Sequence, residues 1–108
     1  MAYEPRIDAM VERFKVLGDK TRLRILVLLQ GRELRVCDLT EVLSISQPGV
    51  SQQMRRLHKA GFVNERRGGQ WIYYTLNMEN SLLALLIPTL PKSEEDEKKI
   101  MMSKGCPT

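Results

Sequence analysis

Hydrophobic residues in the first part of the chain recur with the spacing of helices. Apolar side chains stand three and four positions apart, which is the period of a helix that buries one face. Gly18 and Gly31 each follow such a stretch as a C-terminal stop, and Asp19 stands where an N-cap residue is needed. The pattern therefore predicts helices over residues 6–17, 20–30 and 36–43.

A fourth helix is predicted after the Ser-Ile-Ser turn at residues 44–46. Ser46 is its N-cap, Pro48 falls in its first turn, where a missing N–H is tolerated, and Gly61 ends it. One apolar stripe of this helix is expected to face the core and consists of Val50, Met54 and Leu57. The opposite face is polar and basic, and consists of Gln47, Ser51, Gln52, Arg55, Arg56 and Lys59.

The hydrophobic period changes to two after Gly61, which indicates β-strands. The stretches FVNERR and QWIYYTL are rich in aromatic and β-branched residues and flank a glycine pair. They predict a β-hairpin whose turn lies at Gly68 and Gly69. Arg66 and Arg67 make the tip of this hairpin basic.

Residues 81–90 return to a helical pattern but are apolar around the whole circumference. Such a helix needs a burial partner, and a second subunit would supply one. From Lys92 the chain becomes polar, so this part is expected either to extend the last helix or to form a mobile tail. We therefore expect a folded domain over residues 1–91 and a polar C-terminal tail or helix extension over residues 92–108.

Composition and length narrow the class of protein. The 108 residues, 43% of them apolar and 28% charged, suit one globular domain. The chain shows neither a signal peptide nor an apolar run long enough to span a bilayer, so a cytoplasmic protein without a membrane partner is expected. With one histidine and no nucleophile–base–acid set, an enzyme is not expected, and no resident cofactor is required.

The positive charge is concentrated in one segment. Residues 46–76 hold five basic residues and one acidic residue, an excess equal to the net charge of +4 of the whole chain. A local basic surface favours an anionic polymer as partner, although an ordinary solvated helix face would give the same count.

The order of the predicted elements is informative. Two helices joined by a tight turn, followed by a basic-tipped hairpin, form the layout of a winged helix-turn-helix domain, a mostly α fold with a β-hairpin wing. Its second helix fits the major groove of double-stranded DNA, where Gln pairs with adenine and Arg with guanine. The hairpin tip with Arg66 and Arg67 is expected to lie along the DNA backbone or in the adjacent minor groove. The competing interpretation outside DNA binding is a winged protein-interaction module that docks on an acidic protein surface.

The chain resembles the ArsR/SmtB family of bacterial metal- and redox-responsive repressors over residues 10–78. The resemblance rests on the runs FKVLGDKTRLRILVLL and LRVCDLTEVLSISQPGVSQQMRRLHKAGFVNERRGGQWIYYTLN. It implies a homodimer that pairs through its first and last helices, here residues 6–17 and 81–90, and binds an inverted-repeat operator. It also implies that the recognition-helix contacts to DNA fall on Gln47, Ser51, Gln52 and Arg55.

The same resemblance raises the question of an inducer. Arsenic-sensing members carry a cysteine on each side of the valine in the motif that reads LRVCDL here, and Arg35 occupies the first position while Cys37 occupies the second. Trivalent arsenic favours three thiolates, so the usual thiol pair is incomplete. The family's zinc site needs His and carboxylates on the last helix, and residues 81–90 contain neither.

Three interpretations of Cys37 remain open. It is a small buried core residue, a ligand with Cys106 for arsenite or another thiophilic ion, or half of a Cys37–Cys106 thiol switch that forms a disulfide or polysulfide bridge. The retained VCDL context favours the metalloid, and the long separation of the two cysteines favours redox chemistry. We expect a repressor that a thiol-reactive inducer, arsenite in the first instance, releases from DNA.

Overall fold

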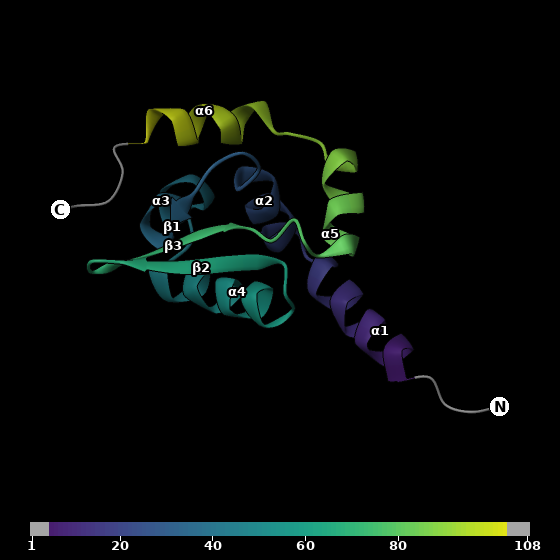
Figure 1. Cartoon of the computed structure of the whole chain (residues 1–108). Coiled ribbons are helices and arrows are strands. Elements are labelled where there is room, and N and C mark those ends of the chain that lie inside the picture. Colours follow the sequence, from purple (N-terminus) through teal and green to yellow (C-terminus); the bar gives the residue numbers. More distant parts are fainter. Residues whose placement is uncertain (1–4, 104–108) are drawn as a thin grey trace.

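The computed structural model describes residues 5–103 and has the winged helix-turn-helix fold that the sequence predicted (Figure 1). Its elements are α1 (Pro5–Leu17), α2 (Lys20–Leu28), β1 (Leu34–Arg35), α3 (Val36–Leu43), α4 (Gln47–Lys59), β2 (Val63–Gly68), β3 (Trp71–Leu76), α5 (Ser81–Leu86), the 3-10 turn η1 (Ile87–Thr89) and α6 (Glu94–Met102). None of the helices within residues 5–103 is both long and apolar enough to cross a membrane.

Side-chain caps fix where the central helices begin. The carboxylate of Asp19 accepts a hydrogen bond from the Arg22 backbone N–H at 3.0 Å, and the Ser46 hydroxyl accepts one from the Gly49 N–H at 3.2 Å. Each cap satisfies an N–H that has no partner inside the helix. Both predicted N-caps are confirmed.

The wing is a three-stranded antiparallel sheet with the order β1-β3-β2. The two-residue strand β1, which pairs Leu34 with Tyr74 and Arg35 with Tyr73, was not predicted, because two residues are too few to show an alternating pattern. The hairpin turn also lies one residue later than predicted. Gly68 is still paired with Trp71, and Gly69 opens the turn with a φ of 61°, a conformation that favours glycine.

The core lies between the helices and the inner face of the wing. Val50, Met54 and Leu57 of α4 are completely buried, as the apolar stripe predicted, and pack with α2, α3, Phe62 and Tyr74. This burial fixes which face of α4 remains outside.

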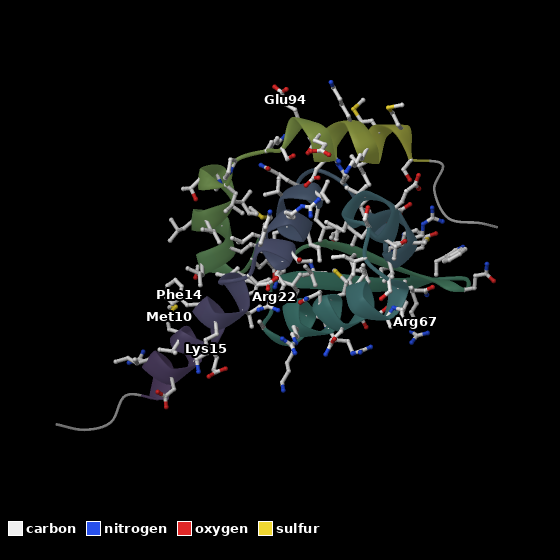
Figure 2. All side chains as sticks on the ribbon, turned by 180° about the vertical axis from the view of Figure 1, so that it is seen from behind. Met10, Phe14, Lys15, Arg22, Arg67 and Glu94 are labelled. Carbon is white, nitrogen blue, oxygen red and sulfur yellow. The ribbon has the colours of Figure 1, made fainter. Side chains whose placement is uncertain are left out.

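One apolar surface stays uncovered in the single chain. The face of α1 formed by Ile7, Met10, Val11 and Phe14 is 38–60% exposed, and Leu85 of α5 is 76% exposed. Figure 2 shows Met10 and Phe14 at the end of the molecule where α1 projects away from the domain. These are the two helices for which the sequence predicted a second subunit.

The C-terminal part differs from both forms that the sequence allowed. The predicted single helix over residues 81–90 ends at Leu86 and continues as the 3-10 turn η1, which contains Pro88. Residues 94–102 then form the separate helix α6, which packs across α2 and α3 on the opposite side of the domain from α4 (Figure 1). Arg24 of α2 holds Asp96 through two hydrogen bonds of 2.8 and 3.0 Å.

Candidate nucleic-acid interface

Helix α4 presents a polar face without acidic residues. Gln47, Gln52, Arg55, Arg56 and Lys59 are exposed, and Ser51 is partly buried. The helix sequence QPGVSQQMRRLHK contains no acid, and none of its cations forms an ion pair within the described part of the chain. The face that the sequence singled out is therefore available to an anionic partner. His58 is also exposed at the end of this helix.

A buried arginine connects α4 to α1. Arg22 of α2 is 8% exposed, and its guanidinium donates to the carbonyls of Lys15 and Val16 at the end of α1 and, at 2.8 Å, to the side-chain oxygen of Gln53 on α4. A buried guanidinium needs such acceptors, because an unpaired charge in the core is strongly unfavourable. Figure 2 shows Arg22 inside the molecule, next to the base of α1. Arg22 thus connects the end of the exposed apolar helix α1 to α4.

The two arginines of the wing lie on opposite faces of the sheet. Neighbouring residues of a strand point to opposite sides, so Arg66 and Arg67 cannot share a face. The pairing of Glu65 with Tyr74 and Arg67 with Ile72 places Arg67 on the inner face, which looks toward α4. Arg66 pairs with Tyr73 and lies on the outer face.

Arg66 is held by two partners on that outer face. Its guanidinium donates two hydrogen bonds to the carboxylate of Glu33, at 2.7 and 3.2 Å, and lies 4.4 Å from the centre of the Tyr73 ring. The guanidinium lowers the pKa of Glu33, chiefly through these hydrogen bonds. Arg67 forms no ion pair within residues 5–103.

A cleft of about 610 Å³ separates the start of α3 from α4 and the wing. Its lining includes Cys37 and, from α4, Gln47, Ser51 and Arg55, while Glu65 and Tyr74 line it from the wing. Burial, and after it the neighbouring carboxylate of Glu65, raise the pKa of Tyr74 above its ordinary value. The cysteine thus shares one cleft with three of the predicted DNA contacts.

Cys37 lies in the first turn of α3, is partly buried and is disulfide-bonded. The structure therefore does not support the interpretation that Cys37 is only a small buried core residue. Cys106, the second predicted ligand, lies outside the described residues, and no cluster of three metal-ligating side chains occurs among residues 5–103. Arg35, which precedes this turn, donates hydrogen bonds from its backbone N–H and its guanidinium to the carboxylate of Asp38, and its guanidinium lies 5.2 Å from the Trp71 ring centre.

Three residues of this region, Arg22, Gln53 and Glu33, were not identified from the sequence. Arg22 and Gln53 lie far apart in the chain, and no local pattern announces a hydrogen bond between helices. Glu33 precedes a strand that was itself missed, so its position beside the wing was not visible. The only available signal was that Arg22 stands in the first turn of the second predicted helix, three residues before the buried run at residues 25–29.

Comparison with known proteins agrees with the winged helix-turn-helix geometry of the chain. Residues 19–65 match the family model described as the bacterial regulatory protein, arsR family. The arsenic resistance transcriptional regulator ArsR1 of Pseudomonas putida is 46% identical over 67 residues, which are 61% of this chain. The chain spans only about half of that relative, since the match covers 52% of its length.

Solved structures extend the similarity over most of the fold. HlyU from Vibrio cholerae superposes with a TM-score of 0.72 at 32% identity and covers 82% of this chain and 94% of that one. A homodimeric winged helix-turn-helix DNA-binding domain from Mycobacterium bovis, described as a possible ArsR-family regulator, gives a TM-score of 0.70 at 27% identity and covers 82% of this chain and 89% of that one. With this fold, this matching segment and these relatives, the chain belongs to the ArsR family of bacterial regulatory proteins.

Proposed function

We propose that the protein is a transcriptional repressor that binds double-stranded DNA as a homodimer. The observation that carries this proposal is the face of α4, which exposes amides and arginines without any acid. A helix of this width enters the major groove, and Gln and Arg side chains distinguish base pairs there. Gln47, Ser51, Gln52 and Arg55 would read bases, while Arg56 and Lys59 would contact phosphates.

The dimer would form through the exposed apolar face of α1 together with α5. This surface is large for a monomer to leave in water, and both helices lie at the end of the domain away from the wing tip (Figure 1). A two-fold axis there would present two copies of α4 to an inverted repeat.

Fluorescence anisotropy on an inverted repeat selected from a random library tests this function. The expected result is specific binding whose affinity falls steeply with salt, because cations of the protein replace counterions of the DNA. The double variant Gln52→Ala, Arg55→Ala should lose specificity while keeping its fold and dimer. An absence of any salt-dependent DNA binding would instead favour a protein-interaction module.

We further propose that a thiol-reactive inducer controls release through Cys37. A bridge between Cys37 and Cys106 is supported by the bonded state of Cys37, since the chain contains one other cysteine. In such a switch the two thiols lose two electrons and two protons to a disulfide or polysulfide oxidant, which is reduced to thiols as the S–S bond forms. The start of α3 would then shift beside α4 in their common cleft.

Arsenite is the second candidate inducer, because the relative ArsR1 is an arsenic resistance regulator and Cys37 occupies one of the family's thiol positions. Arsenite would need Cys37, Cys106 and a third thiolate from outside the chain.

Titrating the reduced protein–DNA complex with arsenite or with a polysulfide separates the two inducers. Release by arsenite that disappears in Cys37→Ser supports the metalloid. Release by the oxidant alone, lost in Cys37→Ser and Cys106→Ser, supports the bridge. No release by either would contradict control through Cys37.

A further inference from the structure

We propose that the two wing arginines have different tasks: Arg67 contacts the DNA backbone, whereas Arg66 and Glu33 form a clamp that positions the wing. This inference rests on the proposed DNA binding and revises the expectation that both arginines contact DNA. Glu33 becomes a positioning residue, although it touches no nucleic acid.

The strand geometry separates the two side chains. Because side chains alternate along β2, only one of the two arginines can lie on the face that looks toward α4. The register puts Arg67 on that face, with Glu65 and Tyr74, and puts Arg66 on the other, against Tyr73. Figure 2 shows Arg67 directed outward on the side of the domain where α4 lies.

The contacts of Arg66 are those of a structural residue. Both side chains of the Arg66–Glu33 pair are exposed, so water weakens the attraction between the charges. The two N–H contacts to one carboxylate and the stacking on Tyr73 still give the guanidinium a defined orientation, which the exposed Glu95–Lys99 pair lacks. Arg35 stands at the other side of the same tyrosine, 5.9 Å from its ring centre, and is itself paired with Asp38. Both arginines on this outer face are thus neutralised by an acid.

The clamp connects the wing to the rest of the domain. Glu33 directly precedes β1, which is paired to β3, and Arg66 belongs to β2 on the far side of β3. Their ion pair therefore bridges all three strands and fixes the hairpin relative to the start of α3. Without it, the wing would keep its fold but sample more orientations, and Arg67 would contact the phosphate less often.

A set of charge variants tests this division of tasks in the full-length protein. Arg67→Gln should lower the slope of log affinity against log salt by about 0.9 per half-site, the loss of one phosphate contact. Arg66→Gln should weaken binding several-fold and leave the slope unchanged. The exchange Glu33→Arg, Arg66→Glu keeps the net charge and the pair, and should recover affinity and slope relative to either single reversal.

Backbone ¹⁵N relaxation of the Gly69 amide provides a second measurement that does not depend on DNA. It should report a more mobile wing in Glu33→Gln and Arg66→Gln, a normal wing in Arg67→Gln, and recovery in the exchanged pair. A slope that falls as much in Arg66→Gln as in Arg67→Gln, together with an unchanged Gly69, would overturn the clamp. If the wild type binds no DNA, the proposed function fails, but the relaxation data still decide whether the clamp exists.

Discussion

Helices α4 and α6 lie on opposite sides of the domain and use their charges in opposite ways. Both begin at a serine cap, and both carry a strongly charged face. The cations of α4 have no acidic partner among the described residues, whereas α6 directs Asp96 and Glu97 at Arg24 and Arg32 of the domain. Charges that are paired within the chain hold an element in place, and charges that are left unpaired are available to a partner.

The largest effect is expected from removing a side chain of α4 that we propose to read bases. Arg55→Ala should reduce discrimination by about 1–3 kcal/mol per half-site, because a bidentate contact to a base edge is lost. Thermal unfolding should hardly change, since Arg55 is exposed. Anisotropy on the selected operator and on a scrambled duplex measures the specific and the non-specific affinity for DNA. Equal losses on the two duplexes would show that Arg55 contacts phosphate and not bases.

A smaller effect is expected from a substitution on α6, and it should lower stability instead of DNA binding. Asp96→Asn leaves the partly buried guanidinium of Arg24 without its carboxylate, and should lower the free energy of unfolding by about 1–2 kcal/mol. DNA affinity of the reduced protein should stay within about twofold of the wild type. Chemical denaturation measures the first quantity and anisotropy the second. A large loss of DNA binding without loss of stability would show that α6 acts on the DNA face.

Acid should remove the contribution of the Asp96–Arg24 pair to the free energy of unfolding. The hydrogen bonds from Arg24 lower the pKa of Asp96, so the folded protein keeps this carboxylate charged at a pH where the unfolded chain protonates it. The stabilisation is therefore complete above about pH 4, the ordinary value for Asp, and is lost as the pH falls through the lowered folded pKa. Thermal unfolding of the wild type and Asp96→Asn should converge in this acidic range. A constant difference down to the lowest pH would contradict this linkage.

The difference between the two helices also explains what the sequence could predict. The face of α4 was predictable because its apolar stripe and its caps are local patterns, and all three residues of the stripe are completely buried as expected. The docking of α6 was not, since it depends on Arg24 and Arg32, which are more than sixty residues away in the chain. Long-range ion pairs have no sequence period, and the polar composition of α6 gave no other sign of a docking face.

The wing shows the same limit within a few residues. Its strands and basic tip follow from local composition. The separate tasks that we propose for Arg66 and Arg67 depend on Glu33 and on the strand register, and a shift of that register by one residue would exchange the faces of the two arginines. A prediction that treats neighbouring basic residues as one patch therefore misses the division between the two faces of a strand.

The smallest effect is expected for Glu95→Gln, which provides a matched control on α6. Glu95 and Lys99 form an i,i+4 pair at 3.1 Å, but both side chains are exposed, so water competes for each charge. The free energy of unfolding should fall by no more than about 0.5 kcal/mol, less than for Asp96→Asn one position away. Denaturation at low and high salt tests the reason: the effect of Glu95→Gln should disappear in high salt, whereas most of the effect of Asp96→Asn should remain. If the two substitutions cost the same, helix formation in α6 rather than its attachment to Arg24 would be what the acids stabilise.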